Sequence, residues 1–288
     1  MTVKLTAEQI TAWRERRFHR RPDLALRTED DAVRFVDEVG FCSLFPDEYA
    51  PMPNLWEAIN GSERPLPDHH NDYALDLTWT WKDSLPERKC FYYGKVVRKK
   101  PTLISLRLLP HFYALSENYG DPYEYLQQYR DGRLSDEARR IYEALLEGGA
   151  MPTSQLRREA LLAGKTNMSR FDRAIRELQA DFKIAKVGIS DANAWGYCYV
   201  YDLFTRRFPE VVEQAQRISG REAMQTILRQ YLENVLAVEE QVLVHLFGWE
   251  QSYLEATVNR LVQDGYLIRG VRVEGTAREC VALAEGWP

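Results

Sequence analysis

The apolar positions between residues 135 and 203 repeat first with the period of a helix and then with that of a strand. Ser135 is a good N-cap for the first helix, whose Ile141 and Leu145 share one face. The predicted elements are helices over 136–147, 152–162 and 167–181 and strands over 183–189 and 195–203, joined by a turn at 190–193. Three helices followed by a two-stranded hairpin is the order of a winged helix.

The same order returns near the end of the chain and, interrupted, near its start. Near the end, helices are predicted over 221–235, 239–247 and 251–263 and strands over 266–273 and 278–283. Near the start, helices are predicted over 7–17 and 29–39 and a strand over 90–100, around an insertion at about 46–87 with one short helix near 55–59. We therefore expect a mainly α protein with small β wings, built from tandem winged-helix (helix-turn-helix) units over 1–130, 131–210 and 211–288.

Composition agrees with a folded protein of the cytoplasm. Apolar residues make up 45% of the chain and aromatic residues 12%, which can fill real cores. No apolar run approaches the roughly 18 residues that span a bilayer, and the first residues lack the apolar stretch of a signal peptide. The cysteines lie far apart, which is typical of reduced thiols: Cys42, Cys90, Cys198 and Cys280. The chain has no C-x-x-C pair, so we expect no metal, and it has no phosphate-loop or dinucleotide motif, so we expect no cofactor.

Charge is distributed unevenly along the chain, although the net charge is only −5. Residues 1–27 carry seven basic against three acidic side chains, and residues 88–176 carry seventeen against ten. Residues 28–87 carry three basic against fourteen acidic side chains, and 177–288 carry eleven against sixteen. Since a polyanion responds to the local field, the sequence predicts two stretches that attract DNA and an acidic stretch, 28–87, that repels it and could bind a protein partner.

The predicted helix over 167–181 has the clearest candidate binding face. At 100° per residue, Phe171, Ile175 and Leu178 form a buried stripe, and Arg173 and Arg176 stand opposite it. Small residues beside arginines allow close approach to a DNA groove. The residues expected to contact DNA are Lys165, Asn167, Ser169, Arg170, Arg173 and Arg176, Arg157 and Arg158 on the preceding helix, Lys183 and Lys186 on the following strand, and Arg98, Lys99 and Lys100.

At these residues the chain resembles the AlkZ/YcaQ-type winged-helix DNA glycosylases. The segments that carry the resemblance are 138–146 (ARRIYEALL), 154–156 (SQL), 200–203 (VYDL), 206–209 (RRFP) and 247–249 (FGW). The resemblance implies tandem winged helices that close around double-stranded DNA and excise alkylated or crosslinked bases. It also implies a further β-rich domain, which would lie beyond Pro288, so the chain resembles a shortened relative.

The chain departs from this family at the catalytic motif. The family has a Gln-x-Gln or Gln-x-Asp pair just after an N-terminal helix, and the positions that match best are Gly40 and Cys42. Neither residue type can hold and activate a water as an amide or a carboxylate can. We therefore expect a DNA-binding protein of this family that lacks base excision, and any enzymatic activity would be that of a DNA glycosylase.

Two alternative functions remain open on the sequence. An active glycosylase could use a remodelled site with a carboxylate such as Glu38, Asp72 or Asp76. A protein-interaction scaffold or transcriptional regulator could instead use the acidic stretch 28–87. Two weaker signals are better explained without a ligand: His69-His70 as a solvated loop, and the aromatic residues Trp79, Trp81, Phe91, Tyr92 and Tyr93 as core.

Overall fold

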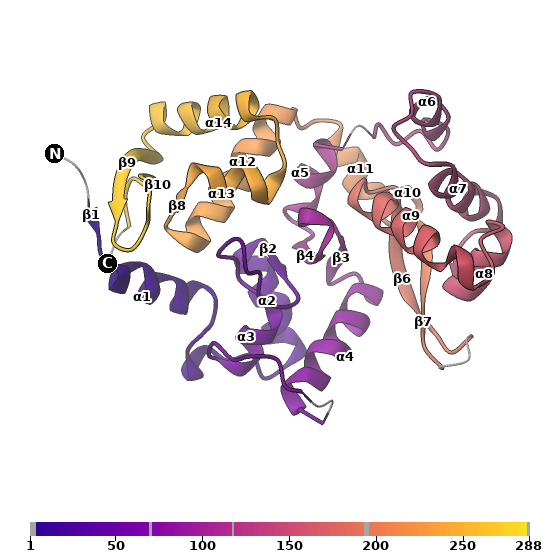
Figure 1. Ribbon diagram of the computed structural model, residues 1–288, viewed down its shortest axis with the longest axis horizontal. Helices are drawn as coiled ribbons and strands as arrows, with labels where there is room; N and C mark the ends of the chain where they lie inside the picture. Colours follow the sequence, from indigo (N-terminus) through magenta and orange to yellow (C-terminus); the bar gives the residue numbers. More distant parts are fainter. Residues whose placement is uncertain (1–3, 69–70, 117, 193–195, 287–288) are drawn as a thin grey trace.

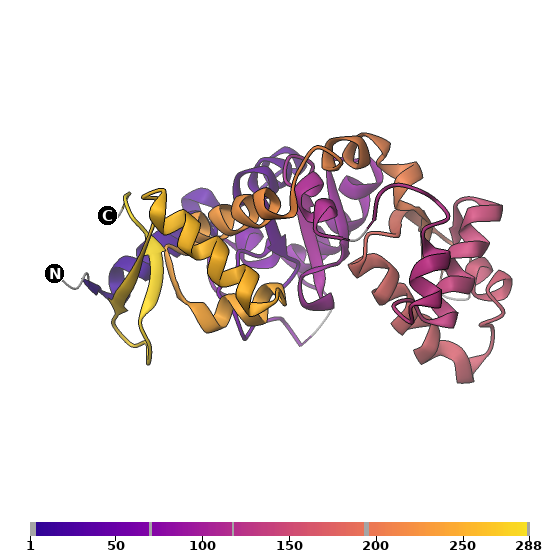
Figure 2. The same cartoon turned by 90° about the horizontal axis from the view of Figure 1, so that it is seen from above.

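The computed structural model of this protein describes residues 4–68, 71–116, 118–192 and 196–286. Over these residues the chain is mainly helical and forms three small sheets, which confirms the predicted fold class (Figure 1). The molecule is elongated, with residues 125–203 at one end and both ends of the described chain at the other (Figures 1 and 2). In the part that is described, no helix is long and apolar enough to cross a membrane.

The central region has the predicted order of three helices and a hairpin. Its elements are α7 (Asp136–Gly148), β5 (Met151–Pro152), α8 (Thr153–Glu159), the 3-10 helix η3 (Lys165–Asn167), α9 (Met168–Ala180), β6 (Ile184–Ser190) and β7 (Cys198–Leu203). The strands form an antiparallel sheet in the order β5-β7-β6. Residues 193–195, which include part of the predicted turn and the start of the predicted second strand, lie outside the described residues.

The C-terminal region takes in the beginning of the chain. Its elements are α12 (Gly220–Val235), β8 (Ala237–Glu239), α13 (Glu240–Phe247), α14 (Gln251–Gln263), β9 (Leu267–Val273) and β10 (Cys280–Leu283). β1 (Lys4–Leu5) adds to this sheet in parallel with β9, and α1 (Ala7–Arg17) packs on α12. The beginning of the unit predicted over 1–130 therefore packs on the C-terminal sheet, while the bounds of the three units stay a prediction.

The remaining N-terminal residues form a compact layer of helices on a sheet. The elements are η1 (Pro22–Leu24), α2 (Glu29–Val39), β2 (Phe41–Ser43), α3 (Leu55–Asn60), α4 (Tyr73–Glu87), β3 (Phe91–Lys95), η2 (Val97–Lys99) and β4 (Pro101–Ser105). The expectation of one short helix in the insertion was wrong, because α4 is a second helix of 15 residues. Its run Leu-Thr-Trp-Thr-Trp alternates like a strand, but Asp72 caps the helix by accepting from the N–H of Leu75.

An aromatic cluster joins the N-terminal layer to the central region. Its rings come from β3, α5 (Leu109–Ala114), the segment after α9, α10 (Phe204–Arg207) and the residue before α11 (Pro209–Ala215). They are Tyr92, Tyr113, Phe182, Phe204 and Phe208, with neighbouring centroids 5.0–6.3 Å apart. The one helix not yet mentioned, α6 (Tyr125–Arg130), precedes α7 in the chain. Because this core is shared, the hairpin β6–β7 has a fixed place beside the N-terminal sheet.

Candidate nucleic-acid interface

Residues 153–180 form a helix–turn–helix whose second helix turns one face to solvent. Gly164 begins the turn at φ +102°, a conformation that essentially only glycine adopts readily. α9 buries Phe171, Ile175 and Leu178, which confirms the stripe predicted from helical angles. The opposite face, with Ser169, is exposed.

This unit carries four exposed cations without a carboxylate partner. Arg158, Lys165, Arg173 and Arg176 are exposed, and none of them forms an ion pair within the described ranges. Arg176 donates only to the backbone oxygen of Asp172, at 3.2 Å. The arrangement presents positive charge and small side chains together, which suits phosphate oxygens and the edges of guanines.

The arginines of α7 show what a neutralised helix looks like. Arg139 pairs with Asp136 at 2.8 Å and with Glu143 at 2.7 Å, and Arg140 pairs with Asp136 at 3.0 Å. Their positive charge is neutralised by carboxylates of α7 itself, so we expect this helix to attract a polyanion only weakly.

Three other predicted contact residues of the unit are already engaged. Arg157 donates to the carbonyl of Gly164 at 3.1 Å, and Arg170 pairs with Glu137. The Asn167 amide donates to the carbonyl of Ala163 at 3.2 Å. These side chains shape the turn, and Arg170 would have to leave its carboxylate to reach DNA.

The prediction that Lys183 and Lys186 contact DNA was wrong. Both side chains are buried, with 2% and 1% of their surface exposed. Lys183 donates to the amide oxygen of Asn118 at 2.7 Å, and Lys186 pairs with Asp83. Burial lowers the pKa of both lysines, and neither ammonium faces solvent where a phosphate could bind.

The basic segment 98–100 is partly neutralised. Asp47 pairs with Arg98 at 2.9 Å and with Lys100 at 3.1 Å. Burial would raise the pKa of Asp47, but hydrogen bonds from the N–H of Tyr49 and from Lys100, with the charge of Arg98, lower it overall. Lys99 stays exposed, beside a cavity of about 310 Å³ at the C-terminal end of α9.

The two positions matched to the family's catalytic pair are enclosed by protein. Gly40 ends α2 at φ +74°, and a Cβ on it would lie 2.5 Å from Cγ of Gln230 on α12. Cys42 on β2 has no exposed surface, and its burial raises the pKa of the thiol. Both positions are therefore closed to solvent in this structure.

Of the three carboxylates considered for an alternative catalytic site, Glu38 and Asp72 form ion pairs and Asp76 lies on an exposed helix face. Glu38 pairs with Arg17 at 3.1 Å and lies 3.3 Å from His19, whose hydrogen bond is the main cause of its lowered pKa. The pKa of Asp72 is lowered mainly by the N–H of Leu75. Asp76 is exposed on α4 and lines neither the cavity beside Lys99 nor the one between α7 and α8.

A cluster that the sequence did not reveal lies between α4 and the hairpin. Lys82, Asp83 and Lys186 meet there with Tyr197 and Tyr199. Coulombic attraction and hydrogen bonds from the two lysines lower the pKa of Asp83, although burial, the largest single effect, raises it. Helical spacing did hold a signal, since Lys82 follows buried Leu75 and Thr78 on one face.

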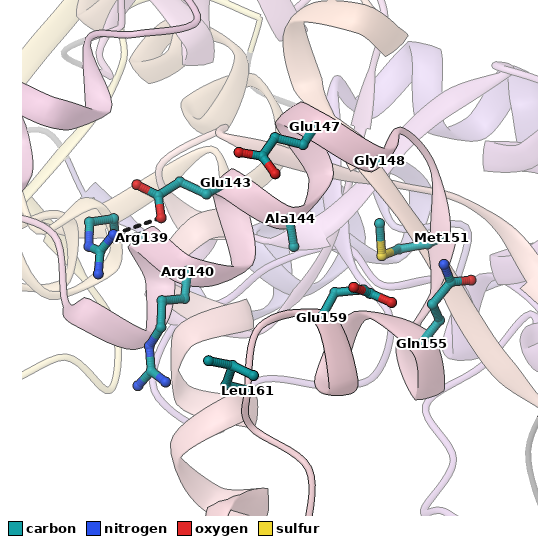
Figure 3. Close-up of a pocket in the computed structure, with 10 residues that line it drawn as sticks. All are labelled: Arg139, Arg140, Glu143, Ala144, Glu147, Gly148, Met151, Gln155, Glu159 and Leu161. Carbon is teal, nitrogen blue, oxygen red and sulfur yellow. Dashed lines mark hydrogen bonds and ion pairs between the residues drawn. The ribbon is translucent and has the colours of Figure 1, made fainter.

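A groove between α7 and α8 has the wrong charge for DNA. It measures about 520 Å³, and Figure 3 shows Glu143, Glu147 and Glu159 around it. The dashed line in Figure 3 joins Arg139 to Glu143, one of the pairs that neutralise its two arginines. The groove is therefore acidic overall and is separate from the exposed face of α9.

The structure describes the aromatic residues near 79–93 but not the pair His69-His70. Trp81, Phe91, Tyr92 and Tyr93 are buried as core, and only Trp79 of that group is exposed. His69 and His70 lie outside the described residues, and among the residues that are described no three His, Cys, Asp or Glu side chains gather as a metal site.

The acidic excess of residues 28–87 is reduced by ion pairs with cations outside the stretch. Glu57 pairs with Arg20, Glu29 with Arg88, and Asp47 with both Arg98 and Lys100. The charge asymmetry of the sequence is therefore smaller in the folded protein.

Comparison with known proteins gives a family and a fold. A family model described as AlkZ related matches residues 26–248. No curated protein matches the sequence. Among solved structures, the chain is similar to the DNA glycosylase AlkZ of Streptomyces sahachiroi, with a TM-score of 0.58 and 15% identity over 98% of this chain and 70% of that one. The protein thus has a DNA-glycosylase-like fold.

Proposed function

The chain belongs to the AlkZ-related family, and we propose that it binds double-stranded DNA, including damaged DNA, without excising a base. The binding surface in this proposal is the exposed face of α9 with the turn before it. The similarity to a DNA glycosylase supports DNA as the ligand. The position of the binding surface is inferred from the distribution of charge.

The observation that carries the proposal is the set of four unpaired cations on one helix–turn–helix. Arg158, Lys165, Arg173 and Arg176 keep their charge available, whereas the arginines of α7 and the cations around Asp47 are neutralised within the protein. Unpaired surface cations release counterions from DNA when they bind, and this release is the main source of non-specific affinity.

The absence of base excision is proposed from the matched catalytic positions. Hydrolysis of a glycosidic bond needs a water that is held and activated next to the sugar. Gly40 offers no side chain, and the thiol of Cys42 is buried with a raised pKa. The proposal includes a location in the cytoplasm, which the four free cysteines of the described chain support.

A salt titration of binding to a short DNA duplex tests the DNA-binding proposal. Four neutralised phosphates should give a log–log slope of affinity against salt of about −3 to −4. No binding at low salt would contradict the proposal and favour a protein-interaction role. Incubation with alkylated and crosslinked duplexes should release no base, and release of a base would instead support a remodelled catalytic site.

A further inference from the structure

Two lysines share one carboxylate in the interior, between α4 and the hairpin β6–β7. Lys82 and Lys186 have 0% and 1% of their side-chain surface exposed, and Asp83 has 12%. An isolated buried ammonium costs several kcal/mol, so each needs an anion close by. With Asp83 as the sole carboxylate bonded to either lysine in the described chain, one positive charge is left without a counter-ion.

Within the described residues, Tyr199 accepts one of the three hydrogen bonds that the Lys82 ammonium donates to side chains. The ammonium of Lys82 donates to Oδ1 of Asp83 at 2.7 Å, to the hydroxyl of Tyr199 at 2.9 Å and to that of Tyr197 at 3.0 Å. The two phenols differ, because Tyr197 donates its own proton to Oδ2 of Asp83 at 2.8 Å. The Tyr199 hydroxyl accepts from Lys82 and bonds to no carboxylate in the described chain, and the hydroxyls of Tyr93 and Tyr197 lie beside it.

The second lysine lies against the same ring. Lys186 pairs with Asp83 and donates to the carbonyl of Lys82 at 3.3 Å, and its ammonium lies 4.5 Å from the centroid of the Tyr199 ring. The ammonium of Lys82 lies 4.9 Å from the same centroid. Tyr199 is therefore the group on which both positive charges converge.

We propose that Tyr199 is present as its phenolate at neutral pH and is the second anion of this cluster. The cluster then contains two ammonium groups, one carboxylate and one phenolate, and its charge is balanced. When the chain folds, the phenol proton passes to solvent, so that folding is coupled to the release of one proton. The proposal concerns the interior and does not depend on DNA binding.

The neighbouring groups agree with this assignment. Burial alone would raise the pKa of Tyr199, but the charge and hydrogen bond of Lys82, together with the charge of Lys186, lower it overall. The other phenols that face the cluster are Tyr93 on β3, Tyr197 just before β7 and Tyr201 on β7, and their pKa values are raised, mainly because of burial. Asp83 takes the opposite direction, with a lowered pKa.

The alternative charge balance has a neutral lysine and a protonated phenol. Burial, followed by the charge of Lys82, lowers the pKa of Lys186, so this amine is the group that would lose its proton instead. The two arrangements have the same net charge, but only one of them contains tyrosinate. Tyrosinate has its own near-ultraviolet absorbance band, which distinguishes them directly.

The experiment measures this band in the folded protein at pH 8 and again after unfolding in denaturant at the same pH. Ordinary tyrosines have a pKa near 10 and stay protonated at this pH. We expect about one tyrosinate per folded chain and its loss on unfolding, which needs no variant to fold. Absence of the band in the folded wild-type protein would overturn the proposal in favour of a neutral Lys186.

Three variants assign the band. Tyr199→Phe should abolish it, and Lys186→Met should abolish it while leaving Tyr199 in place, because the excess positive charge is gone. Tyr123→Phe, at an exposed tyrosine just before α6, should leave the band unchanged. A band that persists in folded Tyr199→Phe would place the tyrosinate elsewhere and contradict the assignment.

Discussion

The side-chain amide of Asn234, on α12, donates a hydrogen bond of 2.8 Å to the carbonyl of Val39, the last residue of α2. Gln230, one turn earlier, donates in the same way to the carbonyl of Glu38 at 3.2 Å. The final carbonyls of a helix have no partner within the helix, so α12 satisfies these two. Through these two hydrogen bonds, α12 is held against the end of α2, next to the segment that carries Gly40 and Cys42.

We expect Asn234→Ala to destabilise the protein by about 1–3 kcal/mol, because it leaves the buried carbonyl of Val39 without a donor. It also removes the acceptor of Arg17, whose Nη2 lies 3.2 Å from the amide oxygen. Denaturant unfolding measures the change. Gln263→Ala, at an exposed position of α14, is the control and should stay within about 0.5 kcal/mol of wild type. Equal stability of the two variants would show that this hydrogen bond contributes nothing net.

Gly40 should not accept the glutamine that the family's motif has at the matched position. Gly40→Ala places a Cβ 2.5 Å from Cγ of Gln230 and imposes a positive φ on a residue with a side chain. We expect Gly40→Gln with Cys42→Asp to lose stability and to release no base from alkylated DNA. Base release by this double variant would mean that the segment can open toward a nucleotide.

A substitution at Gly132 separates two destabilising effects expected at Gly40, the positive φ of the backbone and the steric clash with Gln230. It has a similar φ of +71°, but an added Cβ would meet nothing within 4 Å. Gly132→Ala therefore measures the backbone cost alone, and Gly40→Ala should lose roughly 1–3 kcal/mol more through overpacking. Equal losses in denaturant unfolding would show that Gln230 moves aside without cost.

Replacing Arg173 and Arg176 together by Ala should weaken binding to duplex DNA. Two lost phosphate contacts should reduce the log–log salt slope by about 1–2 units. Fluorescence anisotropy at several salt concentrations measures both the affinity and the slope. Because both side chains are exposed, the folded state should be unaffected.

The control removes two other exposed arginines, each of which already has a carboxylate partner in the protein. Arg217 on the segment after α11 and Arg272 on β9 have 77% and 69% of their side-chain surface exposed. Arg217→Ala with Arg272→Ala changes the net charge equally and should leave the slope unchanged. The same loss in both double variants would mean that DNA responds to net charge and that α9 has no special role.

Acid should remove the stabilisation that Asp47 provides. The folded pKa of Asp47 lies below the ordinary value of 3.8, so its contribution is fully present above that value and is lost as pH falls through the lower folded value. Asp47→Asn should therefore be less stable than wild type at pH 6, and the two should converge in strong acid. A difference in unfolding free energy that does not change with pH would show that the charge of Asp47 is not its cause.

Periodicity and capping residues were enough to predict the elements that are long and amphipathic. The stripe of Phe171, Ile175 and Leu178 follows from helical angles alone, because each of these residues meets the same core. α4 was missed because its alternating Thr and Trp residues resemble a strand, and its packing on β6 decides otherwise.

The errors at the candidate site concern charges whose partners are distant in sequence. A lysine on a short strand looks exposed until Asp83, 103 residues away, is placed beside Lys186. Asn118 likewise lies 65 residues from Lys183. Arg173 and Arg176 were identified correctly as exposed because a helix face is a local property, whereas the burial of a charge depends on tertiary packing.

The parallel pairing of β1 with β9 has a consequence for the order in which the protein is completed during translation. Lys4 and Leu5 pair with Arg272 and Val273, so these residues have no partner strand until β9 has been synthesised. At ~5–20 residues per second, this wait is on the order of tens of seconds. For most of it, the apolar residues of α1 have neither α12 nor the last sheet to cover them. A segment made well before its partners therefore reaches its native place late, and a chaperone would find it exposed in the meantime.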